Sequence, residues 1–138
     1  MSVEVGIHKR WATFRPLTDV VPAERFITGW VPPIDGSAKP TELPFVSLTR
    51  EGDPETGRVS GGVLLTTMTM RFSVWSGSLS EAKAISDNIM SLYGRESFTY
   101  PSGGIVQDMM RINRIENIDE DGVWNVSHDY RVLTQEKE

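Results

Sequence analysis

Polar and hydrophobic side chains alternate with a period of two in the middle of the chain, between Thr67 and Trp75. Side chains two residues apart on an extended backbone point to the same face of a sheet, so one face of this segment is apolar and the other is polar. The segment is therefore predicted to be a half-buried strand. The apolar positions are Met68, Met70, Phe72 and Val74, and the polar positions between them are Thr67, Thr69, Arg71 and Ser73.

An amphipathic helix is predicted directly after this strand. Ser78 is followed three residues later by Glu81. This is the spacing of a capping box, in which the serine hydroxyl accepts from the amide of Glu81 and the carboxylate accepts from the amide of Ser78. Gly94 is expected to end the helix in the left-handed conformation. One apolar helix face should pack on the apolar face of the strand. It comprises Leu79, Ala82, Ile85, Ile89, Leu92 and Tyr93.

The N-terminal third is predicted to hold a short helix followed by extended pieces. Residues Val3 to Phe14 place apolar side chains at spacings of four, four and three, and Pro16 closes the helix. Six prolines between Pro16 and Pro44 leave no room for a second long helix. Two strands are predicted here: an edge strand within residues 25–30, RFITGW, and another within 43–50, LPFVSLTR.

Residues 50–62 are predicted to form a mobile loop. The segment has four glycines and almost no apolar side chain, so it cannot contribute to a core. We expect it to become ordered only against a partner. The side chains expected to pair there with partner groups of opposite charge are Arg50, Glu51, Asp53, Glu55 and Arg58.

The last third is predicted to be a β-hairpin. Residues 105–118 and 123–133 flank the sequence DEDG, whose Asp121–Gly122 pair is a strong turn signal because glycine accepts a positive φ without penalty. The expected fold class is α+β, with an antiparallel or mixed sheet, one long amphipathic helix packed on one face and a short N-terminal helix. Residues 1–138 are expected to form a single domain with a short flexible C-terminal tail.

Composition and charge narrow the function classes. The chain has 138 residues, and its 19 acidic and 14 basic residues give a net charge of -5. This is the wrong sign for a surface that must bind phosphate backbones tightly. The chain has no cysteine, which excludes disulfides, zinc–thiolate sites and thiol nucleophiles. No stretch approaches the ~18 apolar residues that a membrane helix needs, so no membrane contact is expected.

Candidate chemistry is sparse. His8 and His128 are the only histidines, and Asp129 beside His128 should point to the opposite face of a strand. The acidic cluster at 116–121 lacks the ligand order of a calcium loop, and the glycine-rich stretches lack the phosphate-binding lysine. No serine lies in a nucleophile elbow. We expect no enzyme activity, no catalytic residue, no metal and no cofactor.

Several of these pieces, in their order along the chain, resemble the tail terminator, or tail completion, proteins of long-tailed bacteriophages. The resemblance covers most of the chain and is carried by packing residues. A departure is the N-terminal part, where Pro16 and Pro22 shorten the long first helix expected in that family. The matching pieces are Pro44-Phe45-Val46 after a proline-rich lead-in, Phe72-Ser73-Val74-Trp75, and the helix from Ala82 to Tyr93.

The resemblance implies a structural virion protein at the junction of tail and head, assembled in the host cytoplasm. Its subunits would form a ring, usually a hexamer, that caps the tail tube, ends tail growth and meets the head connector. DNA would pass through the ring without specific binding. The strand face with Thr67, Thr69 and Arg71 is then expected to be covered by neighbouring subunits, because an exposed strand would otherwise be an open edge.

Two other function classes remain open from the sequence. A small acidic interaction or adaptor module of a phage or bacterium would have a similar composition, and a stable monomer that binds no tail tube would favour it. A small-molecule-binding α+β domain would need polar groups that converge in an apolar pocket.

Overall fold

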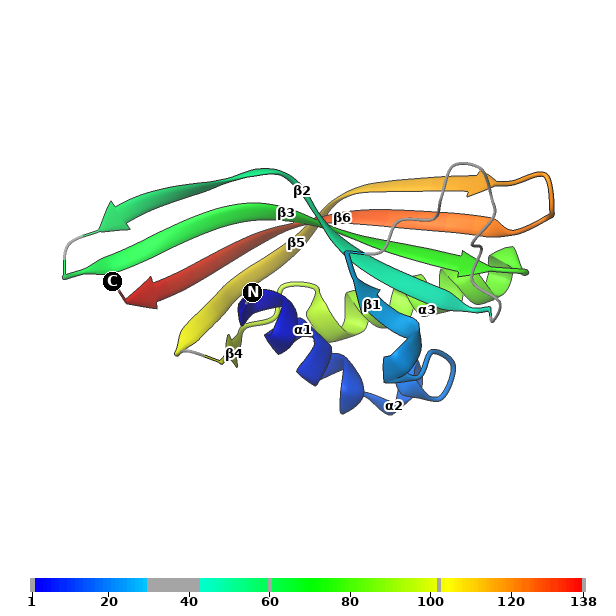
Figure 1. Ribbon diagram of the computed structural model, residues 1–138, viewed down its shortest axis with the longest axis horizontal. Coiled ribbons are helices and arrows are strands. Elements are labelled where there is room, and N and C mark those ends of the chain that lie inside the picture. Colours follow the sequence, from blue (N-terminus) through cyan, green and yellow to red (C-terminus); the bar gives the residue numbers. More distant parts are fainter. Residues whose placement is uncertain (1, 30–42, 60, 102, 138) are drawn as a thin grey trace.

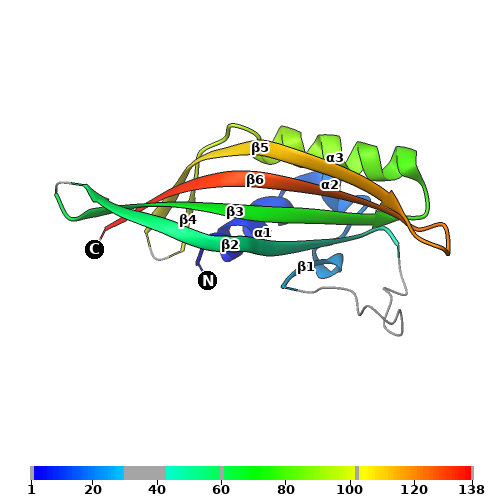
Figure 2. The same cartoon turned by 90° about the horizontal axis from the view of Figure 1, so that it is seen from above.

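The computed structural model describes residues 2–29, 43–59, 61–101 and 103–137. Its strands form one sheet in the order β1-β2-β3-β6-β5-β4, in which β1 and β2 are parallel and every other neighbouring pair is antiparallel. The sheet is curled, and the helices lie on one of its faces (Figures 1 and 2). The elements are α1 (Ser2–Ala12), α2 (Arg15–Thr18), η1 (Ala23–Arg25), β1 (Phe26–Thr28), β2 (Phe45–Val59), β3 (Val63–Ser76), α3 (Leu79–Tyr93), β4 (Phe98–Tyr100), β5 (Gly104–Ile118) and β6 (Trp124–Lys137).

The expected α+β class, built around one long helix, is wrong. Strands take up 53% and helices 27% of the described residues, so the chain is mostly β, with a curled six-stranded mixed sheet and short helices. Four of the strands have 14 or 15 residues each, and two of them, β5 and β6, form the predicted C-terminal hairpin. The strand β6 also continues to Lys137, where the sequence predicts a flexible tail.

The second half of β2 is the main source of this difference. Residues 55–59 pair in register with residues 63–67 of β3, where the sequence predicts a loop. The side chains from Gly52 to Val59 are exposed on both faces of the sheet. A strand with two exposed faces needs no apolar alternation, so the pattern that identifies a half-buried strand is absent from this segment.

The predicted strand at 67–75 lies at the centre of the sheet as part of β3. Its four apolar side chains point toward the helices, and they are 0–6% exposed. Side chains alternate in the same way along β6, where Val126, His128, Tyr130 and Val132 are all fully buried. Between β5 and β6 the chain turns at Gly122, whose φ is +79°. The short β1 lies at the sheet edge, as its sequence predicts.

The two ends of α3 differ from the expected capping geometry. The Ser78 hydroxyl accepts from the amide of Glu81 at 3.4 Å, which is the predicted half of the capping box. The Glu81 carboxylate instead accepts from the hydroxyl of Ser76, at 2.7 Å. At the other end Gly94 has a φ of -62° and Arg95 takes the left-handed conformation. A Cβ on Gly94 would lie 2.6 Å from the Met90 carbonyl oxygen, so close packing, and not a positive φ, requires glycine there.

Helix α1 fills the concave side of the curled sheet. Its apolar stripe of Val3, Ile7 and Trp11 is buried, as the sequence predicts, and the Trp11 ring stacks on Phe26 at a centroid distance of 4.0 Å. On the other side of the helix, Gly6 lies directly against Tyr100 of β4. The helix therefore contacts strands at both ends of the sheet order.

Replacing Gly6 with alanine should destabilise the fold. A Cβ at this position would lie 2.5 Å from the Cβ of Tyr100, so α1 and β4 would have to separate. Alanine normally stabilises a helix relative to glycine, but here overpacking should lower the free energy of unfolding by about 1–3 kcal/mol. Urea unfolding measures the change. Gly77→Ala is the control, because no atom lies within 4 Å of its added Cβ, and equal stability of the two variants would contradict the close contact.

Candidate interaction surface

The helix-free face of the sheet carries the polar side chains of the central strands. Thr67, Thr69 and Arg71 of β3 all lie on it, level with Leu133, Arg131 and Asp129 of β6. These side chains are partly exposed, apart from Arg131, which is exposed. The face is thus a polar surface over the middle of the sheet. Its strand β3 is not an open edge, because β2 and β6 pair with it on both sides.

Arg71 organises the centre of this face. Its guanidinium donates two hydrogen bonds to Asp129, at 2.8 and 3.2 Å, and a third carboxylate oxygen, from Glu51, lies 3.6 Å away. The hydrogen bond to Asp129 raises the pKa of the Arg71 guanidinium. Thr49 in turn donates to Glu51 at 3.0 Å. Strands β2, β3 and β6 are therefore joined by side chains as well as by backbone.

A bulge in β2 forms a polar hollow beside this network. The register of β2 against β3 shifts between Glu51 and Glu55, so residues 52–54 face Met68 alone. Such a bulge bends its strand and re-aims the side chains on it. The hollow gathers two carboxylates, two threonine hydroxyls and one cation at the edge of the sheet. It is lined by Asp53, Glu55, Thr67, Met68, Thr69 and Arg131.

Six of the eight predicted interaction residues thus meet around the bulge, and two arginines do not. Arg50 points to the helix side, where it donates hydrogen bonds of 2.6 and 2.9 Å to the carboxylate of Glu4. Arg58 is exposed near the far end of β2, opposite Leu64. Arg50 therefore joins β2 to α1 within the subunit, and Arg58 lies apart from the bulge.

Glu4 is the ionic partner of Arg50 inside the subunit, and this role was not predicted from the sequence. It is only 4% exposed and lies on the buried stripe of α1, three residues before Ile7 and seven before Trp11. This spacing places Glu4 on the apolar face of the helix, and a carboxylate on a buried face requires a cationic partner. The sequence therefore indicated that Glu4 forms an ion pair. Burial opposes ionisation of Glu4, but the hydrogen bond and charge of Arg50 outweigh it, and the pKa of Glu4 is lowered overall.

His128 and Ser86 form a second buried polar contact, between β6 and α3. Both side chains are fully buried, and the Ser86 hydroxyl hydrogen-bonds the imidazole. Burial, followed by the charges of Arg114 and Arg111, lowers the pKa of His128 to about 4. Asp129 is turned to the opposite face, as the sequence predicts, and is bound by Arg71. The pair therefore lacks an orienting carboxylate and an open surface, and it acts as a core contact.

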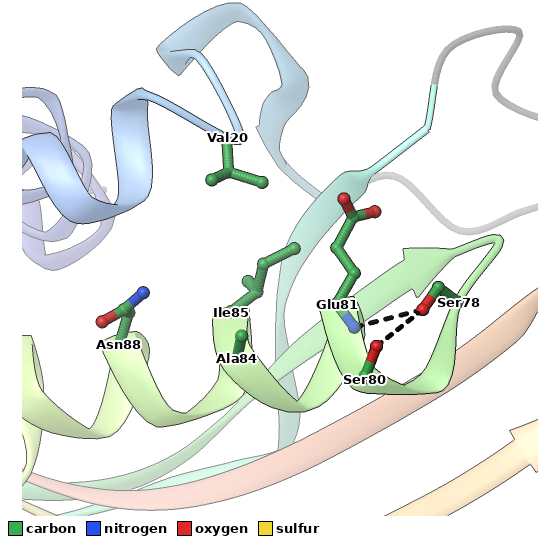
Figure 3. A pocket seen from close by; sticks show the side chains of 7 residues that line it. All are labelled: Val20, Ser78, Ser80, Glu81, Ala84, Ile85 and Asn88. Carbon is green, nitrogen blue, oxygen red and sulfur yellow. Dashed lines mark hydrogen bonds between the residues drawn. The ribbon is translucent and has the colours of Figure 1, made fainter.

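A further hollow lies beside the N-terminus of α3 (Figure 3). Its serine and glutamate groups are engaged at the start of the helix, because Ser78 hydrogen-bonds both Ser80 and the amide of Glu81, and the Glu81 carboxylate accepts from Ser76. Asn88 is the one polar side chain of the lining outside this cap, and one amide does not provide the convergent polar contacts that fix a small ligand. Its lining consists of Val20, Ser78, Ser80, Glu81, Ala84, Ile85 and Asn88.

In the parts of the chain that the structure describes, no three His, Cys, Asp or Glu side chains are grouped so that they could hold a metal ion. None of the helices in the same parts is long and apolar enough to cross a membrane.

Comparison with solved structures shows a structural likeness over almost the whole chain. A chain in the solved virion of a native gene transfer agent particle has a similar fold, with a TM-score of 0.72 and 14% sequence identity. The match covers 98% of this chain and 96% of that chain, and at this identity it shows a shared fold. No protein-family model matches the sequence, and no curated protein matches it either.

Replacing Glu4 with glutamine should destabilise the protein in a pH-dependent way. The substitution leaves Arg50 without its carboxylate and should lower the free energy of unfolding at pH 7 by about 1–3 kcal/mol. Because the pKa of Glu4 is lowered in the folded state, its contribution is present above the ordinary pKa of about 4.5 and is lost as pH falls through the folded value. Chemical unfolding should show that the difference in the free energy of unfolding between the variant and the native protein is smaller at pH 3 than at pH 7. Arg71→Gln, a control in the more exposed network, should cost about 0.2–1 kcal/mol.

His128 should remain neutral down to about pH 4. The unfolded chain binds this proton near the ordinary pKa of about 6.5, so the contribution of His128 to stability should fall as pH drops from 6.5 to 4 and stay constant below. Titration of the ring carbon signals by NMR measures the value directly. A midpoint near 6.5 would show that the imidazole is not buried against Ser86.

Proposed function

We propose that this protein is a structural subunit of a phage-type virion, and specifically that it caps the tail tube as a ring at the head–tail junction. The observation that carries the proposal is the shared fold with a chain of the gene transfer agent virion, which extends over nearly the whole length of both chains. The sequence resemblance to tail terminator proteins supports the finer assignment. In this role the protein ends tail growth and joins the tail to the head connector.

The geometry of the sheet supports assembly into a ring. The two long sides of the subunit are different: one is formed by β1 and β2, the other by β4 and β5. A contact between two unlike surfaces is repeated from copy to copy, and it either closes into a ring or continues as a filament. A capping subunit requires the closed form, and a hexamer is the number that the family resemblance implies.

The helix-free face supplies a polar surface for the partners of the ring. The network of Arg71, Asp129 and Glu51 and the hollow beside it combine charges of both signs over a short distance. In the proposed assembly this region contacts an adjacent subunit or the tail tube protein. The net charge of -5 repels phosphate over roughly a Debye length, ~8–10 Å, so DNA passes through the ring without being held.

The adaptor-module alternative makes a different prediction from the ring, because it leaves the protein a monomer outside the particle. The small-molecule alternative has less support, since the hollow at α3 has its serine and glutamate groups engaged in the helix cap.

Localising the chain in assembled particles tests the proposal. Electron microscopy of particles carrying a tagged copy should place a closed ring of this protein between tail tube and head. Omitting the protein should give tails of uncontrolled length, or tails that fail to join heads. Finding the protein as a monomer, or finding normal particles without it, contradicts the proposed function.

A further inference from the structure

On both long sides of the sheet, a stretch of backbone pairs with no other strand of the described residues. The strand β1 pairs only with Val46–Leu48 of β2, so among the described residues no strand covers the outer edge of β2 from Thr49 to Val59. On the other side, β4 pairs only with Gly104–Val106, and the amide of Arg95 binds the Met109 carbonyl at 2.7 Å. The described chain leaves the edge of β5 uncovered from Met110 to Ile118. Open edges of this length are sites for pairing with another strand.

The two edges are suited to each other in direction. Through the ladder of β2, β3, β6 and β5, the strands β2 and β5 run antiparallel within one subunit. A second copy placed beside the first in the same orientation therefore brings its β5 antiparallel to β2. Antiparallel pairing of this kind continues the sheet from one subunit to the next without a change of strand pattern.

Exposed apolar side chains give a second reason to cover the β5 edge. Ile112, Ile115 and Ile118 are 42–54% exposed, and they account for three of the seven large hydrophobic side chains that are exposed in the described chain. Val59, at the free end of β2, is 44% exposed. Pairing of the two edges would remove parts of these side chains from water.

We infer that the free edge of β2 in one copy pairs antiparallel with the free edge of β5 in the next copy, so that the sheet runs continuously around the assembly. This inference rests on the proposed ring.

We assign to this contact the register in which Gly57 is opposite Met110, because it keeps the helix-free faces of the two copies on the same side. Both residues belong to the helix-free face. Gly57 of β2 pairs with Leu65 of β3. Met110 of β5 pairs with Arg131 of β6, which in turn pairs with Thr69 of β3. Leu65 and Thr69 are four residues apart, so the second copy is displaced along the strands by ~13 Å. A sheet that closes on itself requires a stagger of this kind.

Disulfide cross-linking tests the pairing, since the native chain has no cysteine. The variant Gly57→Cys/Met110→Cys should form disulfides between copies on oxidation of assembled particles, giving a ladder of covalent oligomers on a non-reducing gel. Within one subunit β3 and β6 separate these strands by about three spacings of 4.8 Å, beyond the reach of a disulfide. The control Gly57→Cys/Asn117→Cys moves one thiol by about seven residues, ~23 Å, and should give no ladder.

The outcomes separate this inference from the proposed function. A ring seen at the neck whose subunits do not cross-link at 57 and 110 overturns the edge pairing and leaves the function standing. Cross-linked oligomers of a protein that is absent from the neck overturn the function and leave the pairing standing.

Discussion

The contact of α1 with both ends of the sheet is the constraint on which the rest of the fold depends. On one side the helix meets β1 and β2 through the Trp11–Phe26 stack and the Glu4–Arg50 ion pair, and on the other it meets β4 at Gly6. The sheet can curl this far only because a glycine lets β4 approach the helix axis. The partly buried Glu4–Arg50 ion pair also fixes the position of β2 along the helix, because its two hydrogen bonds require a defined geometry that apolar packing does not.

Curling around α1 also explains why the two sides of the sheet are only half covered. The short strands β1 and β4 stay close to the helix, and both end after three residues. Beyond them β2 and β5 continue toward opposite ends of the molecule (Figure 1). The features that close the core at its centre therefore leave backbone groups available at its periphery, in places where a partner copy can reach them.

The half-buried elements could be predicted from the sequence. The prediction was wrong where a segment is exposed on both faces of the sheet. The alternation from Met68 to Val74 and the stripe from Val3 to Trp11 both reflect burial on one side, and the structure confirms both. The stretch from Gly52 to Val59 faces solvent on both sides, so its glycines and charges resemble those of a loop although its backbone is paired. The prediction for Arg50 has a different cause. The stripe of α1 indicates that the buried Glu4 needs a cation, but it does not identify Arg50, because the two residues are 46 positions apart in the sequence.

The bulge of β2 has a consequence for how the chain can vary in length. Three residues of β2 face one residue of β3 there, and Pro54 lies among them at a position where its missing amide hydrogen interrupts no regular ladder. A residue gained or lost at residues 52–54 changes the size of the bulge and leaves the pairing on either side in place. A residue gained or lost at Val46–Leu48 would instead turn every following side chain to the opposite face. Insertions and deletions should therefore accumulate at this bulge during evolution, and it can change shape to suit a different partner while the core remains the same.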